Sequence, residues 1–323
     1  MQGEQNMKWY KLVFKQKQPI HIGGITWGVV NETEFFIPGW TMWGALTNAF
    51  ILQGLDEELN QNKIEISEIF ETITNFYPVL VEDREDTTQI IKKDPLFPIY
   101  KNGELQFGDY SEDKFRFSFV DTFVSTAVEP VSRKAKDKSL HEVDFVLPQS
   151  KSSANIKGRL YWVGLLGVKE QHCESINNKF LNNDSPQPFQ IYIGGERRYG
   201  YGEIELLKES LNYEVSDEEL AKWNLDREGK FRIDSSTSEA DSSSVILRNF
   251  FHCYPEVISK LKFLGEIRVI AEFNFTQYLP YIKEAEYFIT PGSRIFLNGE
   301  ILRDKQFLLK KGKLMIKSEK EKN

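Results

Sequence analysis

The sequence predicts a mixed α+β protein, and three observations lead to that fold class. Runs rich in aromatic and branched residues, which are typical of strands, occur towards both ends of the 323-residue chain. One segment after Pro38 and Gly39 has apolar residues at helical spacing instead. Strand-like and helix-like segments do not alternate strictly, which argues against a doubly wound parallel sheet.

The composition limits the possible function classes. Hydrophobic residues make up 40% of the chain and charged residues 28%, which is enough for a packed core. The net charge of −7 argues against a uniformly basic nucleic-acid surface, but it leaves room for a local one. The only cysteines, Cys173 and Cys253, exclude a disulfide scaffold, and the N-terminus is polar. We therefore expect a soluble cytoplasmic protein without a membrane partner.

The first elements are a strand, a loop and a helix. Residues 8–14 form a strand-like run, and residues 19–36 are interrupted by glycine before a short aromatic strand end. Pro38 and Gly39 break that strand, and a helix is expected to follow. Its apolar face would comprise Trp40, Trp43, Leu46 and Phe50.

The middle of the chain predicts a long hairpin. Residues 57–76 are expected to be helical, and residues 77–118 mix strand and loop patterns. Residues 119–146 contain two strand-like ends around a basic centre. Between residues 129 and 139, two carboxylates oppose four cations, which are Arg133, Lys134, Lys136 and Lys138. The tip is either a solvated loop or a clamp for an RNA backbone.

The later elements predict a second, smaller sheet. Residues 155–168 are strand-like, and residues 216–224 are expected to form a short helix. Residues 234–244 are low in complexity, which predicts a mobile loop. Strand patterns then recur in residues 263–273, 283–299 and 305–317.

The segment IYIGGERRYGYGEIEL, residues 191–206, combines glycines with basic and aromatic residues. No Lys-Ser or Lys-Thr follows its last glycine, so it is not a P-loop, and a strand pattern follows where a dinucleotide site needs a helix. One interpretation is a tight hairpin. The other is an RNA-binding loop, because arginine forks suit phosphate and tyrosine rings stack on bases. Its candidate residues are Gly194, Gly195, Arg197, Arg198, Tyr199, Gly200, Tyr201 and Gly202.

The four histidines do not predict a metal site. The pairs His172-Cys173 and His252-Cys253 lack the two-to-four-residue gap of structural zinc sites, so we expect neither metal nor cofactor. His21, beside Gly23 and Gly24, is the best candidate for a general base acting on a ribose hydroxyl. The alternative is an ordinary histidine at a strand end.

Three blocks together resemble the RAMP superfamily of CRISPR effector proteins. They are PIHIGGITWG…FFIPGWTMWGAL, TAVEPVSRKAKDKSLHEVDFVLP and GGERRYGYGEIEL, in that order across residues 19–206. The resemblance implies a ferredoxin-like, RRM-type fold that binds CRISPR RNA. The second block would be its thumb hairpin, at about residues 119–146, and residues 192–202 its glycine-rich loop.

The C-terminal segment YFITPGSRIFLNG resembles a strand in the RAMP group that caps the five-prime handle of the guide RNA. The resemblance favours a handle-binding, Cas-five-like subunit of a type III complex, with subtype III-D as a candidate. It also implies two domains: residues 1–210 as the RAMP domain, and residues 211–323 as a degenerate, β-rich second domain with a basic tail.

The resemblance implies a non-catalytic RNA-binding scaffold. Its partners would be the guide RNA, target RNA across the thumb, the large type III subunit and the backbone RAMP subunits. Slicing RAMP subunits carry an aspartate before the IPG motif, and residues 21–38 contain none. Besides the loop and thumb cations, the implied RNA contacts are His21, Gly23, Gly24, Gly39, Trp40, Thr41, Ser293 and Arg294.

Two alternatives stay open. One is a metal-independent, guide-processing ribonuclease that uses His21 or His141 as its general base. The other is a protein-interaction subunit without an RNA contact of its own, which the acidic net charge allows.

Overall fold

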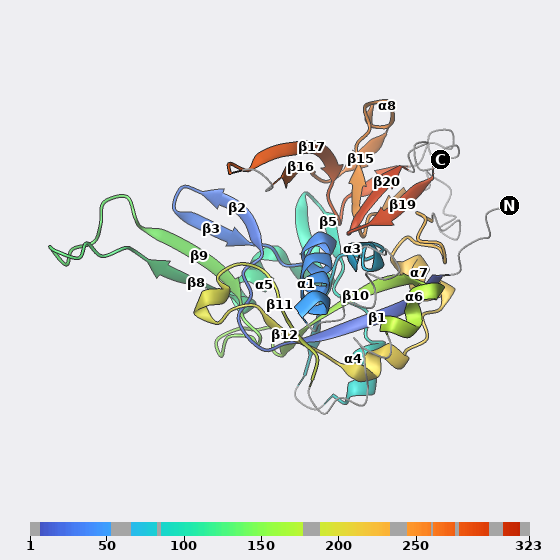
Figure 1. Cartoon of the computed structure of the whole chain (residues 1–323), viewed down its shortest axis with the longest axis horizontal. Coiled ribbons are helices and arrows are strands. Elements are labelled where there is room, and N and C mark those ends of the chain that lie inside the picture. The colour runs from blue at the N-terminus through green and yellow to red at the C-terminus, as the bar shows by residue number, and fades with distance from the viewer. Residues whose placement is uncertain are drawn as a thin grey trace.

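A five-stranded antiparallel sheet forms the centre of the molecule (Figure 1). The computed structural model describes residues 7–52, 66–82, 85–176, 188–232, 244–259, 261–274, 278–296 and 306–316. The strand order of the central sheet is β11-β12-β1-β10-β4. Its strands are β1 (Met7–Gln16), β4 (Tyr77–Val81), β10 (Arg159–Lys169), β11 (Gln190–Tyr192) and β12 (Glu203–Leu206).

Two strand–helix–strand units supply this sheet. The first runs from β1 through α1 (Gly39–Leu52) to β4, and the second from β10 through α6 (Glu170–Ser175) to β12. The first strands of both units, β1 and β10, pair along most of their length at the centre. The remaining helical segments are α3 (Ile66–Ile69), α4 (Thr87–Lys92), α5 (Glu112–Phe119), α7 (Asp217–Lys222), α8 (Pro255–Ile258), and the 3-10 turns η2 (Arg197–Tyr199) and η3 (Lys208–Asn212). Among the described residues, no helix combines the length and apolarity needed to cross a membrane.

Two smaller sheets lie between the strands of the central one in sequence. The first, in the order β2-β3-β9-β8, comprises β2 (Gly23–Trp27), β3 (Val30–Thr33), β8 (Val120–Ser125) and β9 (His141–Val146). The second, in the order β5-β6-β7, comprises β5 (Pro98–Lys101), β6 (Glu104–Phe107) and β7 (Tyr110–Ser111).

Two further sheets come from the C-terminal part of the chain. The three-stranded sheet, in the order β13-β18-β15, comprises β13 (Ser244–Ile246), β15 (Lys262–Leu264) and β18 (Arg294–Phe296). The five-stranded sheet, in the order β16-β17-β14-β20-β19, comprises β14 (Phe250–His252), β16 (Ile267–Asn274), β17 (Tyr281–Ile289), β19 (Phe307–Lys310) and β20 (Lys313–Ile316).

The central sheet is buried on both faces. Along β1, Leu12 and Phe14 belong to a core that also contains residues of α1 and α5. Val13, which points the other way, belongs to a second core with Phe250 and Leu314. Residues from both sides of position 210 therefore share the second core.

A buried ion pair crosses the second core. The Nζ of Lys11 lies 2.8 Å from Oε1 of Glu219, and the two side chains are only 0% and 4% exposed. Lys11 also lies 4.9 Å from the ring of Tyr213. Glu219 is held in α7, whose first turn is capped by the Ser216 side chain. The pair fixes α7 against the central strand.

The predicted α+β class is confirmed, as are the helix after Pro38, the hairpin at 119–146 and the short helix at 216–224. Within residues 19–36, where a loop was predicted, residues 23–33 form the β2–β3 hairpin. Of the helix predicted for 57–76, residues 57–65 lie outside the described residues and α3 is confirmed. The prediction is wrong after α3, because Ile73 and Phe76 form bridges to Leu166 and Ile37. The low-complexity segment at 234–243 lies outside the described residues.

Replacing Glu219 with Ala should lower the free energy of unfolding by about 3–5 kcal/mol, because Lys11 would be left as a buried, unpaired charge. Urea unfolding followed by circular dichroism measures the loss. The double variant Lys11→Met/Glu219→Leu should recover most of it, since no charge remains buried. As a control, Arg227→Ala breaks an exposed ion pair with Asp217, and its effect should stay below about 1 kcal/mol. A Glu219→Ala loss as small as the control's would contradict the proposed importance of the buried pair.

Candidate RNA-binding surface

The glycine-rich loop between β11 and β12 is tied to the segment that precedes β2. The loop is closed by the amide of Ile193, which donates to the Gly202 carbonyl at 3.0 Å. The amide of Gly195 donates to the His21 carbonyl at 2.9 Å, and that of Gly202 to the Pro19 carbonyl at 2.8 Å. Gly202 has φ +96°, and an added Cβ would lie 2.2 Å from the Ile193 oxygen. Only glycine fits at this position.

The loop presents two arginines at the surface. Arg197 and Arg198 belong to the 3-10 turn η2, and both are exposed. The Nε of Arg197 donates to the Gly194 carbonyl at 3.3 Å, which steadies that side chain over the loop. Within the described part of the chain, neither arginine forms an ion pair with a carboxylate. Both guanidinium groups are therefore free to bind an anion.

The tyrosines join the loop to the β8–β9 hairpin. The ring centroids of Tyr199 and Phe123 are 6.1 Å apart, and those of Tyr201 and Phe145 are 5.2 Å apart. A hollow of about 190 Å³ lies between loop and hairpin, lined by Phe123, His141, Val143, Glu196, Tyr199 and Tyr201. Burial, with the nearby Glu196 carboxylate, raises the pKa of the Tyr201 phenol. Loop and hairpin thus form one continuous surface with an aromatic hollow.

The tip of the β8–β9 hairpin carries unpaired cations. The hairpin projects from the body of the molecule, with its tip far from the central sheet (Figure 1). Backbone bonds from Glu129 to Lys134 (2.9 Å) and from Lys136 to Ala127 (2.8 Å) shape the tip. Arg133, Lys134, Lys136 and Lys138 are all exposed, and no described carboxylate pairs with them. The predicted basic tip is therefore a projecting, positively charged arm.

The two candidate histidines differ in their surroundings. The Nδ1 of His21 lies 2.6 Å from the Asp144 carbonyl, and the residue is half-buried beneath the glycine loop. His21 therefore braces the loop. His141 is exposed and lines the aromatic hollow, with its Nδ1 3.2 Å from the Ser139 carbonyl. Gly23 and Gly24 lie in β2, exposed at the edge of the sheet that contains the hairpin.

The start of α1 packs against other parts of the chain. Gly39 is buried, its amide donates to Asn75 Oδ1 at 2.9 Å, and an added Cβ would lie 2.4 Å from the Gly312 nitrogen. Trp40 packs on Phe250, with ring centroids 5.0 Å apart. Thr41 is half-buried in the first turn of the helix. The β19–β20 turn covers Gly39.

The C-terminal candidates lie in another sheet. Ser293 is fully buried, and its Oγ accepts a hydrogen bond from the Glu266 amide at 3.3 Å. The Ser293 side chain is therefore not accessible at the surface of the chain. Arg294 is half-buried in β18, opposite Leu264 and Ile246.

The sequence interpretation missed the contribution of the hairpin strands to the hollow. Phe123, which lines the hollow, comes from β8, and Phe145, which packs on Tyr201, comes from β9. Their aromatic residues were the available signal, but strand pairing was needed to bring them to the loop. Among the described residues, no group of three histidine, cysteine or acidic side chains is placed to hold a metal ion.

The fold of this chain is similar to that of chains in solved structures of a type III-B complex. No protein-family model matches the chain, and no curated protein matches it either. A chain in the cryo-EM structure of the type III-B Cmr-beta bound to cognate target RNA and AMPPnP matches with a TM-score of 0.51 and 13% identity. A chain in the structure bound to cognate target RNA matches with a TM-score of 0.51 and 12% identity. Each match covers 95% of this chain and 99% of the other.

Replacing Gly202 with Ala should loosen the glycine-rich loop, because the added Cβ would push against the Ile193 carbonyl. Hydrogen exchange measured by mass spectrometry should show faster exchange over residues 193–202. The control is Gly200→Ala, which has a similar φ of +82° but open space around it, so it should cost only about 1–2 kcal/mol of backbone strain. Equal exchange rates over residues 193–202 in the two variants would show that the close contact between Gly202 and the Ile193 carbonyl does not stabilise the loop.

Proposed function

We propose that this chain is a non-catalytic RNA-binding subunit of a type III CRISPR effector complex, which holds the five-prime handle of the guide RNA. One observation carries the proposal: two unpaired arginines and an exposed tyrosine lie beside an aromatic hollow, next to a projecting basic hairpin. Splayed bases, stacking and edge contacts are how single-stranded RNA is usually recognised.

The fold supports the proposal. The order β12-β1-β10-β4, with α1 and α6 in the two connections, is consistent with a ferredoxin-like RAMP unit in residues 1–210. Residues 211–323 would be the degenerate second domain. The chain's likeness in fold to chains of the type III-B Cmr-beta structures, which were solved with target RNA, points in the same direction.

Each part of the surface has a proposed role. Arg197 and Arg198 would bind phosphates through their side chains. The amides of Gly195 and Gly202 are already bonded within the protein and would not take part. The aromatic hollow would take an unstacked base between Phe123, Tyr199 and Tyr201. The cations at the hairpin tip would cross the backbone of the first guide–target base pairs. The large subunit and the backbone subunits are the proposed protein partners, and the cytoplasm the proposed location.

The double variant Arg197→Ala/Arg198→Ala tests the phosphate contacts. The RNA that co-purifies with the chain is sequenced, synthesised and titrated at several salt concentrations. The affinity should fall at least about ten-fold, and the slope of log affinity against log salt should flatten by about 0.7 for each lost phosphate contact. The control Lys92→Ala/Lys101→Ala removes the same charge from exposed positions in α4 and β5. An affinity and a slope unchanged from the wild type would refute the role of the arginines.

A guide-processing ribonuclease is the second candidate, favoured by one observation: His141 and Glu196 face the same aromatic hollow. The imidazole of His141 would act there as a general base on RNA. The scaffold proposal predicts that repeat RNA incubated without metal stays intact. Specific cleavage that is lost in His141→Ala, but kept in the control Lys92→Ala/Lys101→Ala, would favour the enzyme instead.

A further inference from the structure

Two exposed apolar strands lie at the edges of two separate sheets. β2 is the edge of the β2-β3-β9-β8 sheet, and β16 is the edge of the five-stranded C-terminal sheet. On β2, Ile25 and Trp27 are 52% and 63% exposed; on β16, Val269 is 51% exposed. Exposed apolar edge strands invite pairing with another chain, so natural proteins usually protect them.

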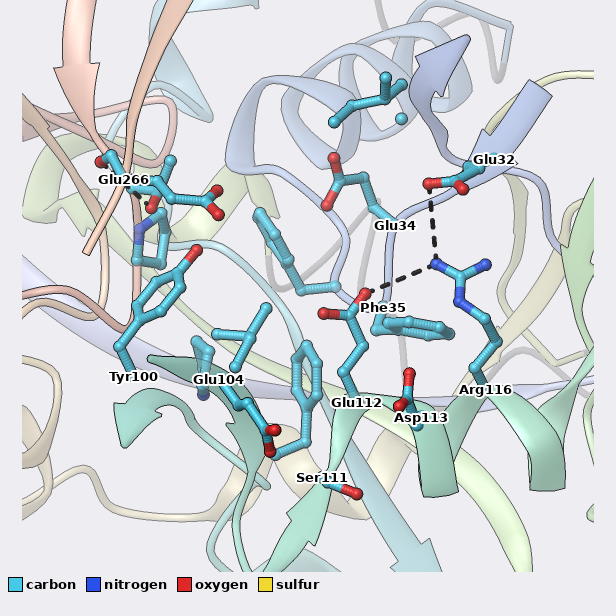
Figure 2. A pocket seen from close by; sticks show the side chains of 18 of the residues that line it. Glu32, Glu34, Phe35, Tyr100, Glu104, Ser111, Glu112, Asp113, Arg116 and Glu266 are labelled. Atoms are coloured by element: carbon cyan, nitrogen blue, oxygen red, sulfur yellow. Dashed lines mark hydrogen bonds and ion pairs between the residues drawn. The ribbon is translucent and has the colours of Figure 1, made fainter. Parts of the chain in front are cut away.

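An acidic cleft of about 330 Å³ lies between these two strands (Figure 2). Gly24 and Ile25 of β2 line one side, and Arg268 of β16 lines another. Six carboxyl groups line the cleft, against two guanidinium groups, those of Arg116 and Arg268. The carboxyl groups belong to Glu32, Glu34, Glu104, Glu112, Asp113 and Glu266.

The two arginines are already shared among some of these carboxylates. Arg268 lies 2.6 Å from Glu34. Arg116 contacts Glu112 at 3.5 Å, Glu32 at 4.0 Å and Asp144, outside the cleft, at 3.0 Å. No described cation forms an ion pair with the other three carboxylates, Glu104, Asp113 and Glu266. The cleft therefore carries uncompensated negative charge.

The electrostatics of the cleft favour an incoming cation. Burial raises the pKa of Glu34 despite the opposing effect of Arg268, and the neighbouring Glu266 adds to the rise. Burial likewise raises the pKa of Glu112 despite Arg116. Both carboxylates are thus held in a cleft that disfavours their charge, and a positive group entering it would relieve that cost. The same charge repels phosphate, which makes RNA an unsuitable occupant.

We propose that this cleft and the two edge strands form a docking site for a partner protein, which inserts an extended segment alternating basic and apolar side chains. The basic side chains would reach Glu104, Asp113 and Glu266. The apolar ones would cover Ile25, Trp27 and Val269, and the backbone would pair with an open strand edge, as in β-strand addition. This inference deepens the proposed function by giving it a protein-binding face, but the geometry that supports it does not depend on RNA binding.

Fluorescence anisotropy with the full-length chain tests the charge and apolar requirements together. Three labelled ten-residue peptides are the probes: alternating valine and lysine, the same peptide with glutamate for lysine, and the same peptide with serine for valine. The valine–lysine peptide should bind at least about ten-fold more tightly than either of the others. No binding of that peptide, or equal binding of the glutamate peptide, would overturn the proposal.

A matched pair of variants locates the binding. Glu104→Gln/Asp113→Asn/Glu266→Gln should weaken the valine–lysine peptide at least about ten-fold. These carboxylates hold no described cation, so unfolding measurements should show a stable fold. The control Glu170→Gln/Glu209→Gln/Glu218→Gln neutralises three exposed carboxylates elsewhere and should bind like the wild type. Equal affinity in the two variants would overturn the proposal.

Two further measurements test whether RNA or a second copy of the chain occupies the docking site instead of a partner protein. The co-purified RNA should bind the cleft variant as it binds the wild type, whereas Arg197→Ala/Arg198→Ala should leave peptide binding unchanged, so failure of one proposal is distinct from failure of the other. RNA that displaces the peptide would overturn the docking proposal. Light scattering that shows a dimer dissociated by Trp27→Ser/Val269→Ser would overturn it too, because the occupant would then be a second copy.

Discussion

The central sheet has to be covered on both faces, and the rest of the fold depends on that requirement. Along β1, Trp9 and Val13 alternate with Leu12 and Phe14, so neither face offers a polar surface to water. The helices α1 and α5 cover one face. Segments that follow position 210 cover the other, which makes the C-terminal sheets part of the support for the strands that present the glycine-rich loop.

Asn75 holds the two parts of the chain together at their closest approach. Its side chain accepts from the Gly39 amide at 2.9 Å and donates to the Gly312 carbonyl at 3.3 Å. Neither glycine has room for a Cβ. A Cβ on Gly39 would collide with the Gly312 backbone, and a Cβ on Gly312 would collide with the Asn75 side chain. Gly39, in the motif that starts α1, therefore has a packing role of its own.

Local pattern was enough to predict features whose residues are close in sequence. The basic hairpin tip at 129–139 and the loop at 192–202 could be recognised because strand, turn and charge signals lie side by side. The pattern failed where distant segments meet: nothing near Ser293 shows that Gly265 and Glu266 cover it. The acidic cleft was missed for the same reason, because its carboxylates come from four separate parts of the chain.

The distribution of charge explains how an acidic chain can present a basic surface. Arg198 and the cations of the hairpin tip have no described carboxylate partner, and Glu104 and Asp113 in the cleft have no described cation. Exposed ion pairs contribute little to stability, so leaving these groups unpaired costs little free energy of folding. Each surface keeps the electrostatic field of its unpaired charges, which attracts a ligand of opposite charge. One sheet, β2-β3-β9-β8, carries the basic hairpin on one side and borders the acidic cleft with its edge strand on the other. Guide RNA and partner protein would therefore bind the same sheet at opposite edges without competing for its charges.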